Sequence, residues 1–253
     1  DPHFMAEGAR IAEAHGADII DINMGCPAKK VIGGLSGSAL MREPELALSL
    51  IAATVKAVKV PVTLKMRLGW DDQSINAPDL AAAAADLGVQ MITVHGRTRM
   101  QFYKGRADWS MIARVRERIT IPLIANGDVE TPDDIDSILA LSGADGVMIG
   151  RGSQGRPWHA GVLAGMRAAP EPDEVAAIFE RHYRMMLEFY GEQSGLRHAR
   201  KHVGWYLDRL AAPVAADRRT GLLTSHDVER VVADMRELLS GPTRSDPSLS
   251  EAA

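Results

Sequence analysis

The sequence predicts an α/β protein in which parallel strands form a β/α barrel and a small all-α domain follows. Two observations carry this prediction. Over the first part of the chain, short apolar strands alternate with amphipathic helices, and this order gives parallel strands joined by right-handed crossovers. After Pro170 the alternation stops and only helical periodicity remains. The β/α units recur about every 25 to 30 residues, which fits a (β/α)8 barrel of the TIM type.

The predicted strands lie at residues 18–23, 61–67, 90–95, 121–126 and 146–150. Helices are predicted between them, near 44–58, 78–87, 109–118 and 131–141. A further helix opens the chain, because Asp1 is a good N-cap and Pro2 suits the first helical position. A closed barrel needs eight strands, so either the sheet is open and doubly wound, or three β/α units precede residue 1. The start on a helix cap, without an initiator methionine, favours the second alternative.

The chain is predicted to divide into a barrel domain, 1–169, and a helical domain, 170–240. Pro170-Glu171-Pro172 marks the hinge between them. Helical periodicity then recurs over 173–190, 196–210 and 225–239. The last residues, 241–253, are rich in Ser and Pro and are predicted to form a disordered tail.

Composition excludes several classes of protein. The 253 residues carry a formal net charge of −4, so any polyanion has to meet a local basic patch. A single cysteine excludes an internal disulfide and indicates a reducing, cytoplasmic compartment. The sequence shows neither an apolar run long enough to cross a bilayer nor a basic-then-apolar leader, so no membrane association is predicted.

Polar residues flanked by glycine occur at the ends of all the predicted strands. Active sites of β/α barrels lie at the C-terminal ends of the strands, so these residues are the candidate site. The intervening Ile20, Ile22, Leu64 and Ile92 are expected to face the helices. The strand period of two places the polar side chains on the other face: Asp21 and Asn23, Lys65 and Arg67, Thr93 and His95.

Cys26 is the candidate catalytic residue. An isolated cysteine is more often a buried packing residue, by about two to one. Gly25 and Pro27, however, force a turn directly after the first strand and bring the thiol to the mouth of the barrel. The sequence therefore favours a chemical role.

Lys65 and His95 leave alternatives open. Lys65 could form a Schiff base or stabilise negative charge on a cofactor. A lone histidine such as His95 is more often structural than a metal ligand, and it has no partner at metal-ligand spacing, so no metal is predicted. Gly127 and the Gly150–Gly152 turn occupy the last strand ends, the usual phosphate site of barrels.

Together these motifs resemble the tRNA-dihydrouridine synthases, most closely the bacterial B-type subgroup. The most specific string is Asp21-Ile22-Asn23-Met24-Gly25-Cys26-Pro27-Ala28-Lys29-Lys30. It is supported in order by His95-Gly96-Arg97-Thr98-Arg99, Ala125-Asn126-Gly127-Asp128, Gly150-Arg151 and Gln154-Gly155-Arg156-Pro157-Trp158. The chain departs from the family at its start, where an earlier Pro-Met strand and a glutamine are absent, and this also predicts missing upstream units.

The resemblance implies an FMN enzyme that reduces selected uridines of tRNA to 5,6-dihydrouridine, with NADPH as reductant. Hydride addition at C6 of uracil leaves an enolate, and a thiol, ordinarily protonated at neutral pH, can give the proton to C5. The family's catalytic cysteine falls on Cys26 and its uracil-contacting asparagine on Asn23, and Arg97 is assigned to the substrate. The FMN contacts fall on Lys65, His95, Asn126, Gly127, Asp128, Gly150 and Arg151.

Contact with tRNA is predicted for the helical domain, through Arg197, Arg200 and Lys201 on one helix. A short charge run is more often a solvated helix face, and the resemblance favours RNA over that interpretation. Other basic residues nearby are Arg181, Arg184, Arg218 and Arg219. No obligate protein partner is inferred. The competing hypotheses are another FMN barrel of the dihydroorotate dehydrogenase or old yellow enzyme kind, a class I aldolase using Lys65, and a tRNA-binding protein without catalysis.

Overall fold

The computed structural model describes residues 1–33 and 35–241. The predicted tail lies outside the described residues apart from Gly241. The chain folds into two compact units. The first comprises Asp1–Val129 and Asp133–Gly150, and the second comprises Glu130–Pro132 and the chain from Arg151 onward. This division falls ahead of Pro170, where the sequence pattern changes, and the domain bounds 1–169 and 170–240 stay predictions.

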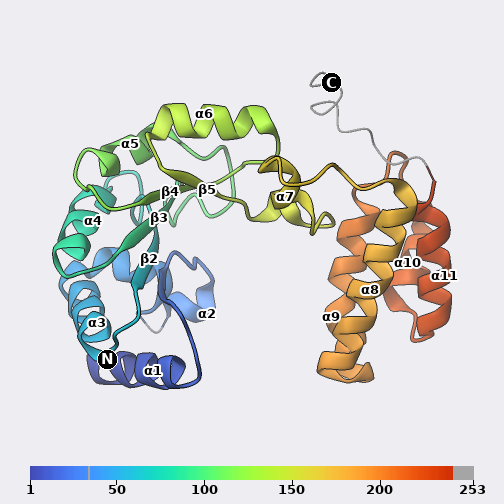
Figure 1. Cartoon of the computed structure of the whole chain (residues 1–253), viewed down its shortest axis with the longest axis horizontal. Helices are drawn as coiled ribbons and strands as arrows, with labels where there is room; N and C mark the ends of the chain where they lie inside the picture. The colour runs from blue at the N-terminus through green and yellow to red at the C-terminus, as the bar shows by residue number, and fades with distance from the viewer. Residues whose placement is uncertain (34, 242–253) are drawn as a thin grey trace. The chain divides into compact units, whose positions relative to one another are not determined.

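The first unit is built on a parallel sheet whose strands pair in chain order, β1-β2-β3-β4-β5 (Figure 1). A doubly wound sheet reverses its strand order at a switch point, and no such reversal occurs among the described strands. Strands added always on the same side, through right-handed crossovers, put every connecting helix on one face, which is the winding of a β/α barrel. The doubly wound alternative is therefore wrong. The strands are β1 (Ile20–Met24), β2 (Val62–Arg67), β3 (Met91–His95), β4 (Leu123–Asn126) and β5 (Gly146–Met148).

The helices of the first unit begin close to where their caps and prolines predict. The Asp1 side chain accepts a hydrogen bond of 2.7 Å from the backbone N–H of His3 and so caps the first helix. Proline stands in the first turn of the helices after β1 and β2. The elements are α1 (Pro2–Ala14), α2 (Lys29–Ile32), η1 (Gly37–Arg42), α3 (Pro44–Ala57), α4 (Ala77–Asp86), α5 (Ser110–Arg116) and α6 (Pro132–Ser142).

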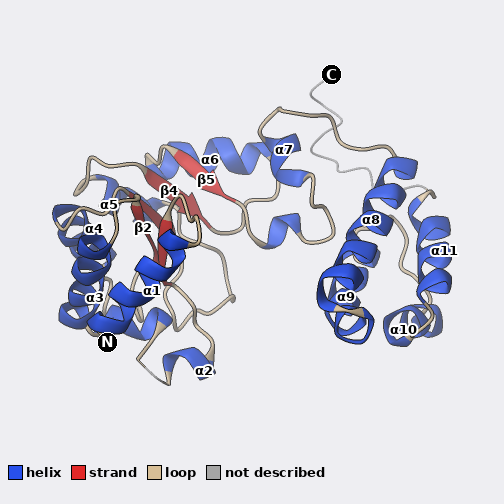
Figure 2. Ribbon diagram, turned by 60° about the horizontal axis from the view of Figure 1, so that its bottom comes forward, coloured by secondary structure: helices blue, strands red, loops and turns tan. Residues whose placement is uncertain are grey.

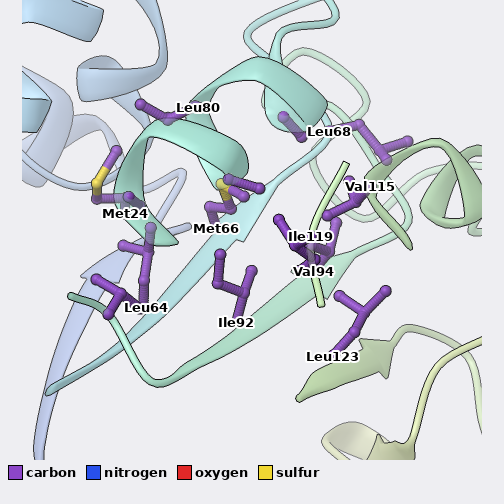
Figure 3. Packing of buried hydrophobic residues seen from close by; sticks show 14 of the residues in the cluster. Met24, Leu64, Met66, Leu68, Leu80, Ile92, Val94, Val115, Ile119 and Leu123 are labelled. Carbon is purple, nitrogen blue, oxygen red and sulfur yellow. The ribbon is translucent and has the colours of Figure 1, made fainter. Parts of the chain in front are cut away.

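The two faces of the sheet differ in polarity, as the period of two predicts. Apolar side chains on one face form the core with the covering helices, among them Leu64, Met66 and Ile92, which are fully buried (Figure 3). Full burial of such a side chain contributes about 1.5 to 3 kcal/mol. The opposite face carries the polar residues Asp21, Asn23 and Lys65, which remain exposed or half-buried. The helix-covered face thus supplies stability and leaves the other face available for chemistry.

The second unit is helical in its described part (Figure 2). Its core gathers Phe179, Tyr183, Val203, Tyr206 and Met235. The α8–α9 hairpin packs closely because a Cβ at Gly195 would lie 2.7 Å from the Cα of Leu187. The elements are η2 (Arg151–Ser153), α7 (His159–Leu163), α8 (Pro172–Tyr190), α9 (Glu192–Leu207), α10 (Ala216–Thr224) and α11 (Val228–Leu239).

Candidate active site on the polar face of the sheet

Strand register brings the predicted site residues side by side. Asn23 of β1 pairs with Lys65 of β2. One step further along the sheet, Arg67 pairs with His95, and His95 pairs with Asn126. Residues in register on parallel strands point to the same face. The sheet therefore gathers, at its C-terminal edge, side chains that are far apart in the sequence.

The turn that carries Cys26 is held at several backbone groups. The Asn23 Oδ1 accepts a hydrogen bond of 2.9 Å from the Gly25 N–H. The Gly25 carbonyl accepts one of 2.8 Å from Arg67 Nε. The Cys26 carbonyl accepts from the backbone N–H and the hydroxyl of Ser38, at 3.0 and 2.9 Å. The half-buried thiol thus stands on a fixed turn directly after β1.

Glycine is required at position 37, because the first residue of η1 packs directly against the Cys26 turn. Its φ is +57°, and a Cβ there would lie 2.7 Å from the Cys26 carbonyl oxygen. A side chain would therefore be strained by its backbone and would also push against the turn. Sequence reasoning did not single out Gly37 or Ser38, because nothing local marks them as neighbours of Cys26.

Lys65 lies beside the same turn. A Cβ placed on Gly25 would be 3.8 Å from Lys65 Nζ and 3.7 Å from Asn23 Oδ1, so ammonium and amide border one small region. Burial, then Arg67, lower the pKa of Lys65, and Asp21 opposes them. A half-buried cation of this kind is suited to stabilise negative charge on a bound group.

His95 is buried and belongs to a network with two charged residues. Its Nε2 lies 3.2 Å from Arg97 Nη1, so Nε2 accepts and the proton is on Nδ1. Burial, followed by the positive charges of Arg67, Lys65 and Arg97, lowers the pKa of His95 to about 3. The imidazole is therefore neutral at physiological pH.

Arg97 uses every N–H of its guanidinium inside the protein. Two bonds reach the Asp128 carboxylate, at 2.9 and 2.6 Å. The others reach His95 and the carbonyls of Lys104 and Gly105. The side chain is 2% exposed. Arg97 was predicted to contact the substrate. In the structure all its donors bind other groups of the protein, and it holds the loop after β3.

Asp128, Asn126 and Gly127 connect the end of β4 to its neighbours. Asp128, at φ +58°, accepts from Arg97 and, at 2.7 Å, from the Ala107 N–H. Asn126 Nδ2 donates to the Met148 carbonyl at 2.8 Å. Gly127 has φ +127°, and a Cβ there would lie 2.6 Å from the Cβ of Ala107. The structure thus gives these three residues clear architectural roles next to His95.

The remaining predicted FMN contacts, Gly150 and Arg151, adjoin the boundary between the two units. Gly150 closes the first unit, two residues after β5, and a Cβ there would meet nothing within 4 Å. Arg151 opens η2 in the second unit. Both assignments stay predictions.

In the helical unit, ion pairing separates the predicted basic residues into two groups. Arg184 is bound to Glu180 and Glu229, each at 2.9 Å. Arg218 and Arg219 pair with Glu237 and Asp208. Within the described residues, Arg197, Arg200 and Lys201 have no carboxylate partner; Lys201 Nζ lies 5.7 Å from the centre of the Trp205 ring, and Arg197 Nη2 donates to Ser194 Oγ at 3.3 Å. The three predicted tRNA contacts thus differ from Arg184, Arg218 and Arg219 in having no ion pair among the described residues.

The described residues present neither a metal-binding cluster nor a membrane-spanning helix. Over residues 1–33 and 35–241, His, Cys, Asp and Glu side chains do not gather in a set of three or more suited to hold a metal ion. No helix in the same part of the chain has the length and apolar character needed to cross a bilayer.

Fold and site together define a β/α-barrel protein whose polar sheet face presents a thiol, a cation and amide groups at the strand ends. The chain belongs to the dihydrouridine synthase family, whose family profile matches residues 1–237. The resemblance predicted from the motifs is therefore confirmed.

Curated relatives agree with this assignment. A probable tRNA-dihydrouridine synthase of Rhizobium leguminosarum bv. phaseoli is 65% identical over 94% of this chain and 75% of its own length. One from Rhodobacter capsulatus is 54% identical, over 84% of this chain and 68% of its own length. The tRNA-dihydrouridine synthase B of Xanthomonas axonopodis pv. citri is 43% identical, over 100% of this chain and 78% of its own length.

Proposed function

We propose that this protein reduces uridines of tRNA to 5,6-dihydrouridine, with bound FMN as cofactor and NADPH as the reductant. One observation carries the proposal: Asn23, Lys65 and the turn that bears Cys26 lie together at the C-terminal edge of the sheet. Membership of the dihydrouridine synthase family supports it. A tRNA substrate and a single cysteine both favour a cytoplasmic enzyme.

The residues present fit a flavin. Lys65 offers a desolvated cation on the polar face at β2, and Asn126 and Gly127 offer amide groups at the end of β4, two strands away. Glycine at position 127 lets Ala107 and His95 pack against this strand end, where a side chain would clash. FMN, when bound, supplies the hydride that adds to C6 of uracil. Lys65 would stabilise negative charge on the bound cofactor, and the neutral His95 would be able to donate a hydrogen bond through Nδ1–H.

Proton transfer is the step that the chain's own residues perform. Addition at C6 leaves an enolate over C5, C4 and O4 of uracil, and C5 must receive a proton. Cys26 is the acid, because its thiol stands on a fixed turn whose preceding residue, Gly25, borders Asn23 Oδ1 and Lys65 Nζ. One lone pair of Asn23 Oδ1 is used by the Gly25 N–H, so the Asn23 Nδ2 donor is the group we assign to a uracil carbonyl.

Arg197, Arg200 and Lys201 of α9 are proposed to neutralise tRNA phosphates, since no carboxylate among the described residues competes for them. A uracil inside the folded tRNA is not accessible to a thiol, so the target base has to leave its stack. The free energy needed to unstack the base has to be offset by the tRNA contacts and by the pocket that receives the base.

The purified chain, loaded with FMN and NADPH, tests the proposal on unmodified tRNA. Replacing the acid in Cys26→Ala is expected to slow dihydrouridine formation about 100-fold or more, the usual range for a general acid, while the flavin absorbance stays. Ser49→Ala, on the exposed side of α3, is the matched control and should keep the parent rate. Equal rates for Cys26→Ala and the parent would refute Cys26 as the acid, and a flavin-bound parent inert on tRNA would refute the substrate.

A further inference from the structure

Arg67, at the end of β2, is a buried arginine that the family motifs did not single out. It is 1% exposed although it lies on the polar face of the sheet. Its guanidinium donates to three backbone carbonyls: Gly25 at 2.8 Å, and Thr98 and Phe102 at 2.9 Å each. Carbonyl oxygens carry no net charge, so Arg67 has no ion-pair partner in these bonds. Because the guanidinium is rigid and planar, the bonds fix the backbone of the two loops relative to each other.

The two loops lie far apart in the sequence and carry different parts of the site. Gly25 immediately precedes Cys26, and Thr98 and Phe102 belong to the loop after β3 that Arg97 and Asp128 also hold. A second, longer contact joins the same loops, since Arg99 Nη2 lies 3.5 Å from the Pro27 carbonyl. The Arg67 guanidinium also lies 5.5 Å from the ring of Tyr103. Arg67 is therefore the closest link between the Cys26 turn and the loop after β3.

We propose that Arg67 is a positioning residue that sets the height and orientation of the Cys26 thiol by locking the Gly25 carbonyl to the loop after β3. As a statement about catalysis this rests on the proposed function. As a statement about the turn it does not, because the fork of N–H groups fixes Gly25 whatever the substrate is. Lysine cannot replace it, since one ammonium group cannot reach carbonyls on both loops in the same geometry.

The only cysteine of the chain reports on this lock directly. The rate at which a disulfide reagent modifies Cys26 is measured in the full chain without FMN or tRNA. Arg67→Lys is expected to raise that rate about tenfold or more, because a single ammonium group cannot hold the Gly25 carbonyl and the loop after β3 together, and the turn then opens more often. The matched control is Arg116→Lys, which removes bonds from a guanidinium to the Ile119 and Ile121 carbonyls elsewhere in the same unit.

The Arg116→Lys rate should stay within about twofold of the parent if the effect is local. The proposal is overturned if Arg67→Lys reacts at the parent rate, or if both variants accelerate alike, which would indicate general loosening. In an active preparation Arg67→Lys should lower kcat and leave KM for tRNA unchanged, since Cys26 acts in the chemical step. A parent inert on tRNA removes the proposed function and leaves the labelling result intact.

A variant that fails to fold does not end the test, because the parent itself can be measured. Native-state hydrogen exchange over a denaturant series gives the free energy of opening for each segment. One guanidinium holds both loops, so the amides of Gly25 and Cys26 and those of residues 98–103 should open together. Opening of either segment at a clearly lower free energy than the other would overturn the proposal.

Discussion

The variant Asp128→Asn tests whether burial makes the Arg97–Asp128 pair important for the stability of the fold. The Asp128 carboxylate accepts bonds of 2.9 and 2.6 Å from Arg97 and one of 2.7 Å from Ala107. The Arg97 side chain is 2% exposed and that of Asp128 25%. Removing one partner of a buried pair costs about 3 to 5 kcal/mol, because the other charge stays uncompensated. The partial exposure of Asp128 places the expected loss at the lower end, about 3 kcal/mol.

Asp79→Asn is the matched control. Asp79 pairs with Arg118 at the same distance of 2.6 Å, but the side chains are 76% and 52% exposed. A surface pair of this kind is worth about 0 to 1 kcal/mol. Hydrogen exchange of the amides of β3 and β4 over a urea series reads the stability of the sheet-bearing unit by itself. If Asp128→Asn costs no more than Asp79→Asn, the burial argument is wrong.

Two further predictions follow from the titration of His95 and from the pairing of basic residues. Because the pKa of His95 is about 3 when folded, the unfolded chain binds more protons below the ordinary value of 6.5, and stability falls as pH falls from 6.5 toward 3. His95→Gln should reduce the loss of unfolding free energy between pH 7 and pH 5 by about 2 kcal/mol, and an unchanged loss in urea titrations would contradict the stated cause. The double variant Arg197→Gln and Lys201→Gln should lower the slope of log K for tRNA against log salt by about 1 to 2. Arg184 is already paired with Glu180 and Glu229, so Arg184→Gln should leave that slope unchanged. If all three substitutions lowered the slope equally, the distinction between paired and unpaired cations would be wrong.

The alternation of residues along the strands was enough to predict the fold class and the two faces of the sheet. Lys65 and Met66 are adjacent in β2, yet one is half-buried on the polar face and the other fully buried against the helices. All predicted strand boundaries are within two residues of those observed, and the largest differences, two residues each, occur at the start of β1, the start of β4 and the end of β5. The short β5, Gly146–Met148, ends two residues before Gly150, which was predicted to be its last residue.

The roles of individual charges could not be predicted, because they depend on partners that only the fold supplies. Arg97 resembles an RNA contact in the sequence, and the adjacency of β3 and β4 brings it to Asp128 instead. The charge of Arg184 is likewise neutralised by Glu229, which comes from a different helix. Helix α10 was not predicted, because only Leu222 of its residues is buried and its periodicity is weak.

The order in which the strands pair has a consequence for synthesis of the chain. From β2 onward, each described strand pairs with the strand made just before it. In a doubly wound sheet, by contrast, some strands have an unpaired edge until a later part of the chain is translated. Here every new β/α segment that emerges from the ribosome can dock on an edge already formed, so contacts stay short in sequence and little apolar surface is exposed to aggregation. The described groups of the site are thus assembled one strand at a time, and the Cys26 turn is made before Lys65, His95 and Asn126.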